Sequence, residues 1–422
     1  MNATGNFRWR IVALLFFSTT INYIDRLVIG ILKPYIASDL GWTDVHYGYI
    51  VTAFQIAYAI GLLVTGSFLD KFGSKIGYAI AIVIWSVGGI GHALAQGIFS
   101  FGLFRSILGF GESANFPAAV KTTAEWFPKK ERALATSWFN SGANIGAVIA
   151  PVIVSLVTLK FGWRWAFVIT GALGFIWLAF WLPMYKSPDK HKKLSKAEFD
   201  YINSDSEPET KEKVKWKDLF KYRQTTGICF MKLATDWVWW FYLYWIPDFL
   251  NKTHGVDIKQ VVLPLIIIYT FSSVGGIAGG WMSSNYLKHG KSLDFSRKNT
   301  MLIFAIAVLP IVFAANTNSL WLVIGLVAWA TAAHQGWSNN LFTIISDVYP
   351  KKTVGSMVGL AGFVGAMGGA VSAAFIGWIL QLTNSYVIVF TVAAVMYLLA
   401  WLSMKIFIPT IQSIKLDKTT VV

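Results

Sequence analysis

Long apolar stretches, separated by short polar segments, run along almost the whole chain. A helix needs about 20 apolar residues to cross a hydrocarbon core roughly 30 Å thick, because each helical residue rises about 1.5 Å. Stretches of this length recur along the sequence, and they predict an all-α membrane protein with twelve transmembrane helices. The predicted crossings are 11–35, 46–69, 76–95, 98–120, 134–157, 165–186, 224–250, 260–286, 299–316, 319–346, 354–381 and 385–408.

One polar insert divides this pattern into two sets of six crossings. Residues 187–223 are rich in lysine, glutamate and serine and hold no apolar run long enough to cross a bilayer. We therefore predict an N-terminal six-helix bundle over 1–186, a cytoplasmic linker over 187–223 and a C-terminal six-helix bundle over 224–422. Inside the linker, Ser195 and Glu198 have the spacing of a helix-capping box, in which the Glu side chain reaches back to the Ser, and this predicts a short surface helix.

The charge distribution predicts the topology. Only 14% of the residues are charged, against about a quarter in soluble domains, and the net charge is +15. Most lysines and arginines fall in loops that share one side of the membrane, and basic loops stay in the cytoplasm. This predicts both termini inside, in a bacterial inner membrane. The basic excess is spread over short loops without a folded basic domain, so it argues against nucleic-acid binding. The basic residues assigned to the outer side are Lys33, Lys160, Arg164, Lys252 and Lys259.

Enzyme chemistry finds no support in the sequence. No metal-ligand cluster, nucleophile elbow or cofactor fingerprint occurs in a suitable context, so we expect no metal and no cofactor. The segment from His289 to Ser292 resembles the end of a phosphate-binding loop, but Asn285 stands where the first glycine of that loop is required. ATP-driven transport is therefore not indicated.

Four ionisable side chains lie inside predicted crossings of the N-terminal half. On insertion scales, placing each of them at the bilayer centre costs about 2.5 to 3.5 kcal/mol of free energy, so each needs a structural or functional explanation. Asp25 and Arg26 lie in the first crossing, while Arg105 and Glu112 lie seven residues apart, on nearly one face, in the fourth. Two guanidinium groups suit a carboxylate substrate, and two nearby carboxyls suit proton exchange. The structural alternative is that the four groups only neutralise one another.

A second pair of charges lies in the seventh crossing. Lys232 and Asp236 are four residues apart, which suits an intrahelical salt bridge. We favour this structural interpretation, because each group satisfies the other locally. Whether the pair also acts in function is left open.

Polar and aromatic side chains in the crossings suit a hydroxylated, sugar-like ligand. The alternative is that the amides bond neighbouring helices and that the aromatic rings pack or anchor at the membrane interface. The amides need partners of some kind, since they lie within lipid. The candidates are Tyr58, Asn144, Trp239, Trp240, Tyr242, Tyr244, Gln335, Asn339 and Asn340.

The segment between the second and third crossings carries a family signature. The run from Gly66 to Lys75, GSFLDKFGSK, resembles the G-x-L-x-D-(R/K)-x-G-x-(R/K) loop of the major facilitator superfamily. In this gating loop we expect Gly66 to allow close helix approach, Asp70 to meet helix dipoles and arginines, and Gly73 to complete the motif. A generic basic turn is the alternative.

Longer segments resemble one branch of that superfamily. Asn22 to Arg26, Arg105 to Pro117 and Ala333 to Phe342 are similar to the bacterial sugar-acid branch of the anion:cation symporter family, and most of all to hexuronate transporters. The resemblance implies proton coupling at Asp25 and Glu112. It also implies contacts to the sugar acid from Tyr23, Arg26, Tyr58 and Arg105.

Together these observations predict a proton-coupled symporter for a sugar-acid monoanion. We expect a hexuronate, bound by the two arginines with amides on its hydroxyls, and carried by alternating access in a protein that works as a monomer in the lipid bilayer. Two alternatives remain. One is a symporter for aldonates such as galactonate, or for other organic anions. The other is a membrane sensor that binds a solute without transporting it.

Overall fold

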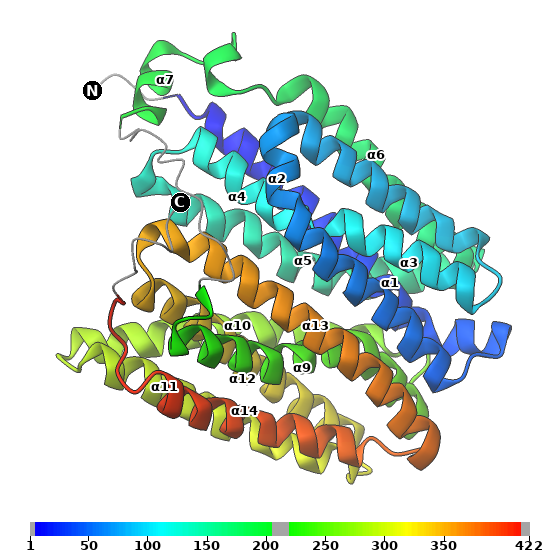
Figure 1. Cartoon of the computed structure of the whole chain (residues 1–422). Helices are drawn as coiled ribbons and strands as arrows, with labels where there is room; N and C mark the ends of the chain where they lie inside the picture. Colours follow the sequence, from blue (N-terminus) through cyan, green and yellow to red (C-terminus); the bar gives the residue numbers. More distant parts are fainter. Residues whose placement is uncertain (1–4, 205–218, 415–422) are drawn as a thin grey trace. The chain divides into compact units, whose positions relative to one another are not determined.

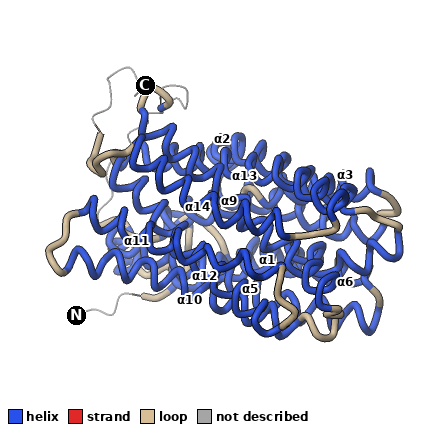
Figure 2. Tube along the Cα trace, turned by 90° about the horizontal axis from the view of Figure 1, so that it is seen from below, coloured by secondary structure: helices blue, strands red, loops and turns tan. Residues whose placement is uncertain are grey.

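The computed structural model describes residues 5–204 and 219–414, and this part of the chain is helical, without a strand (Figure 1, Figure 2). The middle of the predicted linker lies outside the described residues. The helices are α1 (Phe7–Leu40), α2 (Asp44–Gly91), η1 (His92–Leu94), α3 (Ile98–Glu112), α4 (Asn115–Trp126), α5 (Lys129–Phe161), α6 (Trp163–Met184), η2 (Pro188–Lys190), α7 (Lys196–Ile202), α9 (Arg223–His254), α10 (Val262–Lys288), α11 (Leu293–Val308), η3 (Leu309–Ala315), α12 (Leu320–Val348), α13 (Lys351–Thr383) and α14 (Val387–Phe407).

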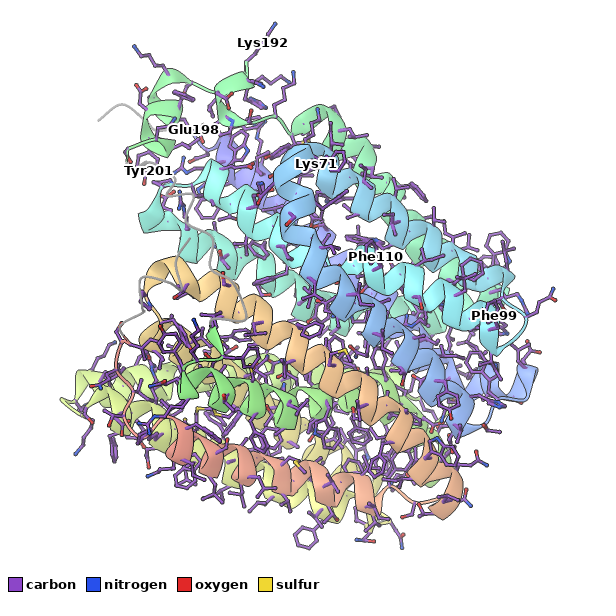
Figure 3. The ribbon with its side chains drawn as sticks, in the orientation of Figure 1. Lys71, Phe99, Phe110, Lys192, Glu198 and Tyr201 are labelled. Carbon is purple, nitrogen blue, oxygen red and sulfur yellow. The ribbon has the colours of Figure 1, made fainter. Side chains whose placement is uncertain are left out.

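The twelve predicted crossings all coincide with helices, to within a few residues. Three of them are built from two elements: 76–95 ends in η1, 98–120 combines α3 with α4, and 299–316 combines α11 with η3. Among the described residues, eight helical stretches are long and apolar enough to span a membrane by length and composition alone. Large apolar side chains are also exposed, as at Phe99, which is 85% exposed (Figure 3). An all-α membrane protein is therefore confirmed.

Two helices differ from the simple pattern of separate crossings. The second and third crossings are not separated by a loop of several residues, because α2 leaves helical geometry only at Gly73, with φ 74° and ψ 162°. A positive φ is open to glycine at no steric cost, so one residue makes the turn. Helix α1 contains Pro34, which has no N–H to donate to the carbonyl of Gly30, four residues earlier.

The chain divides into two compact units, which are described separately. Unit 1 comprises Met1–Leu32 and Ile56–Thr210, and unit 2 comprises Lys33–Gln55 and Lys211–Val422. The segment 33–55, which holds the end of α1 and the start of α2, thus groups with the C-terminal helices. The predicted boundaries at 186 and 223 stay a prediction.

Glycines allow the helices of unit 1 to pack closely. A Cβ atom on Gly142 of α5 would lie 2.4 Å from the carbonyl oxygen of Phe16, and one on Gly146 would lie 2.5 Å from that of Thr20. Both distances are shorter than any van der Waals contact, so α5 and α1 meet at backbone distance only because these residues lack side chains. Small residues allow such approach in membrane helices, where apolar burial gives little driving force. The packing holds the middle of α1 in place.

In unit 2, glycines likewise allow α10 and α12 to pack closely. A Cβ atom on Gly275 would lie 2.1 Å from the carbonyl oxygen of Ala332, and one on Gly279 would lie 2.6 Å from Cα of Gly336. The helices α13 and α14 pack on α9, and α11 packs on α12.

The predicted linker helix is confirmed as α7, but its capping box is only half formed. Ser195 accepts a hydrogen bond from the backbone N–H of Glu198, as predicted. The Glu198 carboxylate instead accepts from the backbone N–H groups of Phe7 and Arg8, at 3.1 and 3.0 Å, and from the Arg8 guanidinium. A tertiary partner with more donors therefore replaces the local one. Figure 3 labels Glu198 and Tyr201 on this helix.

Candidate functional site

The four charged side chains predicted for the N-terminal half come together inside unit 1. Asp25, Arg26, Arg105 and Glu112 are at most 4% exposed. The Arg26 guanidinium donates to the Glu112 carboxylate at 2.8 Å and to the side-chain oxygen of Asn22 at 3.2 Å. The Arg105 guanidinium donates to the backbone oxygen of Arg26 at 3.2 Å, so it braces the helix that carries the other two groups.

The geometry follows from helical spacing. Arg105 and Glu112 lie seven residues apart on α3, so both side chains project from one face, and that face meets α1 where Asp25 and Arg26 lie. Because two always-charged guanidinium groups lie in this interior, the cluster has the chemistry of an anion site. The ion pair between Arg26 and Glu112 already neutralises part of it.

Asp25 is the least satisfied member of this cluster. In the part of the chain that the structure describes, its carboxylate accepts at most a weak hydrogen bond, from the side chain of Thr170. Its charged neighbours are Glu112 and Arg105, which act on it with opposite signs. Burying an ionised carboxylate with so little hydrogen bonding is costly, so a proton or a cation has to offset its charge.

Two tyrosines predicted as substrate contacts surround Arg26. The guanidinium carbon lies 5.0 Å from the ring centroid of Tyr23 and 5.0 Å from that of Tyr58. Rings at this distance stabilise a cation and leave its edge open for planar hydrogen bonds. Asn144, on α5, is half-buried and is not bonded to this group among the described residues.

The polar stretch of α12 lies in unit 2 and bonds mainly to α10. Asn340 donates to the backbone oxygens of Gly279 and Gly336, at 3.1 and 2.8 Å, and Asn339 donates to that of Gly276 at 3.1 Å. The amide nitrogens of Asn339 and Asn340 therefore join α12 to α10, as the structural alternative states. Gln335 is half-buried on the same helix.

The predicted intrahelical salt bridge on α9 is confirmed. The Lys232 ammonium lies 2.6 Å from the Asp236 carboxylate and 4.4 Å from the ring centroid of Phe342. A Cβ atom on Gly365 of α13 would lie 2.3 Å from the same carboxylate, so the pair occupies space that the glycine leaves.

The gating loop has one partner that the sequence did not indicate. Asp70 accepts a hydrogen bond of 2.6 Å from Lys121 on α4, rather than from an arginine. Among the described residues, no atom lies within 4 Å of the position that a Cβ on Gly66 would take. The close helix approach expected at Gly66 stays a prediction. Gly73 supplies the turn described above.

A second charged cluster, which the sequence analysis missed, lies in unit 2. The Lys33 ammonium, 1% exposed, donates to Asp44 at 2.6 Å and also to Asp248. Lys252 donates to Asp44 at 2.6 Å, and the Tyr386 hydroxyl donates to Asp248. We call these five side chains the outer ion network.

Helical spacing was the available signal for part of this network. Lys252 follows Asp248 by four residues, so these two side chains lie on one helix face. That Lys33 meets Asp248, more than 200 residues away, has no local signal.

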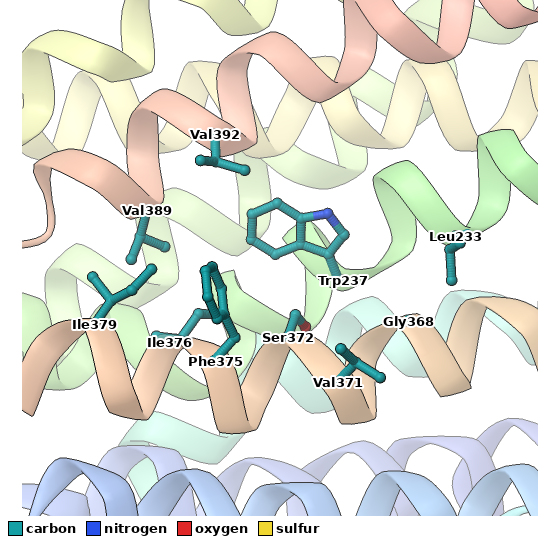
Figure 4. Close-up of a pocket in the computed structure, with 10 residues that line it drawn as sticks. All are labelled: Leu233, Trp237, Gly368, Val371, Ser372, Phe375, Ile376, Ile379, Val389 and Val392. Atoms are coloured by element: carbon teal, nitrogen blue, oxygen red, sulfur yellow. The ribbon is translucent and has the colours of Figure 1, made fainter.

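One hollow in unit 2 is apolar and does not suit an anion. It has a volume of about 370 Å³ and lies between α9, α13 and α14 (Figure 4). Trp237 and Phe375 are among its lining residues, and no charged side chain is. Among the described residues, no group of three or more His, Cys, Asp or Glu side chains is arranged to hold a metal ion.

Comparison with known proteins gives concordant results. A sequence model of the Major Facilitator Superfamily matches residues 15–373. The chain is 33% identical over 368 residues to the hexuronate transporter of Escherichia coli K12, covering 86% of this chain and 85% of that one. It is 29% identical over 390 residues to the D-galactonate transporter of E. coli O6:H1, covering 89% and 90%. A solved structure of a bacterial homologue of the human lysosomal transporter Spinster, inward-facing and unoccupied, matches with a TM-score of 0.75 at 18% identity, covering 96% and 99%, and this supports the fold alone.

Proposed function

The chain belongs to the major facilitator superfamily, and from this membership we propose that it takes up a sugar-acid monoanion, most specifically a hexuronate, together with protons. The observation that carries the proposal is the buried cluster of Asp25, Arg26, Arg105 and Glu112 in unit 1. Two always-charged guanidinium groups match a substrate that carries a carboxylate. The names of the relatives, a hexuronate and a galactonate transporter, support the same class of solute.

The ion pair between Arg26 and Glu112 offers a coupling mechanism. A substrate carboxylate that reaches Arg26 competes with Glu112, which holds the same guanidinium at 2.8 Å. When Glu112 takes a proton, this competition weakens and the guanidinium presents its donors to the substrate. Asp25, which is buried and at most weakly hydrogen-bonded among the described residues, is the second proton carrier in the proposal.

The number of protons decides whether transport moves charge. One proton with one monoanion is electroneutral, whereas two protons carry a net positive charge inward, worth about 2.3 kcal/mol per 100 mV of membrane potential. With Asp25 and Glu112 both available, the site permits either.

The transport cycle in this proposal is alternating access in a monomer. The two six-helix bundles, 1–186 and 224–422, move during the proposed cycle. The outer ion network closes the external side by holding the segment 33–55 on α9 and on the residue before α14. Asp70 and Lys121 belong to the cytoplasmic gate. Both termini lie in the cytoplasm of a bacterial cell, because basic residues concentrate in the loops on that side.

The test is uptake by proteoliposomes of labelled uronates, aldonates and dicarboxylates, with and without an imposed pH gradient. We expect wild-type protein to accumulate uronates only with the gradient. Glu112→Gln should lose accumulation and keep exchange, and Arg105→Ala should lose binding. Asp189→Asn, which changes an exposed carboxylate, is the matched control.

Three results would count against the proposal. Uptake in Glu112→Gln that still responds to pH would remove the coupling role of that residue. Retained affinity in Arg105→Ala would remove its carboxylate contact. Binding by wild-type protein without accumulation would favour the solute sensor, and preference for galactonate would favour the aldonate symporter.

A further inference from the structure

A basic turn follows α6 in unit 1. It runs from residue 186 to residue 196, through η2 to the first residue of α7, and it carries five lysines. Every one of these lysines is exposed, and none of their ammonium groups pairs with a carboxylate among the described residues. The lysines are Lys186, Lys190, Lys192, Lys193 and Lys196.

The basic turn is held against the ends of two membrane-spanning helices. His191 donates from Nε2 to the carbonyl oxygen of Met184, the last residue of α6, at 3.2 Å. The His191 ring also packs on Phe7, the first residue of α1, with ring centroids 4.2 Å apart. The exposed guanidinium of Arg10 lies 5.5 Å from the centroid of the same Phe7 ring, so a further basic group lies beside the turn. Because α1 and α6 both have the length and composition of membrane spans, the turn lies where these helices leave the lipid.

Glu198 of α7 fixes the chain that follows the basic turn. Its carboxylate, on a residue that is 2% exposed, accepts from the backbone N–H groups of Phe7 and Arg8 and from the Arg8 guanidinium. Figure 3 labels Lys192 and Glu198 at the same end of unit 1. The lysines are therefore carried by an ordered segment, which is anchored at His191 and at Glu198.

The exposed charge on this segment is mainly positive. Glu131 and Glu198 both pair with Arg8, so their charges are offset within the protein. Between residues 186 and 204, the exposed carboxylates are those of Asp189 and Asp200. Five exposed lysines therefore face two exposed carboxylates, and the surface attracts anions.

A purely topological role does not require this arrangement. Basic loops set the orientation of a membrane protein through their charge, and they need no fixed shape for it. An ordered group of exposed lysines beside a spanning helix is also suited to binding a second charged surface. Polybasic segments in this position are attracted to anionic lipid headgroups, and the attraction decays over a Debye length of about 8 Å at physiological salt.

We propose that the basic turn of unit 1 binds the phosphate groups of anionic phospholipids at the membrane surface. Each lysine ammonium is a compact charge with three donors, which suits phosphate oxygens. The partner is lipid and not a soluble phosphate, because the anchors at Met184 and Phe7 keep the lysines beside the headgroups. The inference does not depend on which solute the protein carries.

The test measures lipid binding by the purified full-length protein. Protein freed of lipid in detergent is titrated with dioleoyl phosphatidylglycerol, which is anionic, or with dioleoyl phosphatidylcholine, which has no net charge. Bound lipid is counted by native mass spectrometry. We expect wild-type protein to bind phosphatidylglycerol more tightly, and an excess of soluble glycerol phosphate should not displace it.

Charge variants locate the binding on the turn. Lys192→Gln combined with Lys193→Gln should weaken phosphatidylglycerol binding about 25-fold, at about fivefold for each lysine near the surface, and leave phosphatidylcholine binding unchanged. Asp189→Asn removes a negative charge from the turn and should strengthen phosphatidylglycerol binding. The matched control is Lys288→Gln combined with Lys291→Gln, which removes two exposed lysines of unit 2 and should bind like wild type.

One further variant tests the shape of the turn separately from its charge. His191→Ala keeps all five lysines but removes the hydrogen bond to Met184 and the ring contact with Phe7. We expect phosphatidylglycerol binding to weaken, because the lysines are no longer held at the helix ends. Binding equal to that of wild type would show that an unanchored basic loop suffices, and it would refute the role of the anchors.

Three other results would overturn the proposal. Equal losses in the two double-lysine variants would reduce it to a general attraction between opposite charges. Equal affinity of wild-type protein for the two lipids would remove the preference for anionic headgroups. Displacement of the lipid by glycerol phosphate would make the turn a site for soluble phosphates.

Discussion

In the proposed transport cycle, replacing Lys33 by methionine should release the external side. Lys33 is buried between two carboxylates, with its ammonium 2.6 Å from Asp44 and in contact with Asp248. It also lies over the rings of Tyr47 and Trp245, at 5.1 and 4.7 Å from their centroids. Methionine keeps much of the apolar stem and removes the charge. In this network, Lys252 is then the one cation left to neutralise Asp44 and Asp248.

The size of the effect follows from the burial of this ion pair. Removing one partner of a buried pair costs about 3 to 5 kcal/mol, because the other charge stays buried. Lys252, whose side chain is 43% exposed, offsets part of that cost, so we take the lower end. About 3 kcal/mol changes the ratio of closed to open protein roughly a hundredfold, at about 1.4 kcal/mol per factor of ten.

The assay is the reaction of a cysteine at position 52 with a membrane-impermeant maleimide. Thr52 lies on the face of α2 that packs on α13, so a cysteine there is protected while the external side is closed. The single native Cys229 is replaced by serine in all variants. We expect Lys33→Met to raise the external labelling rate up to about a hundredfold.

The double variant Lys33→Met, Asp248→Asn supplies the control. It removes one charge of each sign and leaves the pair between Lys252 and Asp44, 2.6 Å apart, intact. Labelling should therefore return most of the way to the wild-type rate. Equal labelling of the single variant and wild type would show that the outer ion network does not hold the external side closed.

Two further variants test contacts that fix the helices. Glu198→Gln removes the charge that accepts three hydrogen bonds from Phe7 and Arg8, and it should lower the free energy of unfolding by about 1 to 3 kcal/mol. Thermal unfolding in detergent measures this, and a melting temperature equal to that of Asp189→Asn would contradict it. Gly365→Ala places a Cβ atom 2.3 Å from the Asp236 carboxylate and should destabilise by about 1 to 3 kcal/mol. Gly280→Ala, with nothing within 4 Å of its added atom, should be close to neutral, and equal melting of the two alanine variants would refute the crowding.

Local patterns in the sequence were sufficient to place the helices. Apolar length placed a helix at each of the twelve predicted crossings, since the bilayer favours one length for each span. Spacing by four and seven residues also indicated the salt bridge between Lys232 and Asp236 and the shared face of Arg105 and Glu112, because both depend only on the geometry of one helix.

Contacts between distant segments lay beyond these patterns. The capping rule predicted the Ser195 hydrogen bond, but Glu198 binds the start of α1, which no spacing inside the linker encodes. The outer ion network joins charges from α1, α2 and α9 that looked like ordinary flanking residues.

Pro34 makes one stretch of α1 easier to bend than the rest of the helix. The helix is one uninterrupted element from Phe7 to Leu40, yet unit 1 ends at Leu32 and unit 2 begins at Lys33. A proline leaves the carbonyl four residues earlier without its helical donor, so the stretch from Gly30 to Pro34 bends more easily than its neighbours. The flexible point of α1 therefore lies at the boundary between the two units, inside a continuous helix and not in a loop.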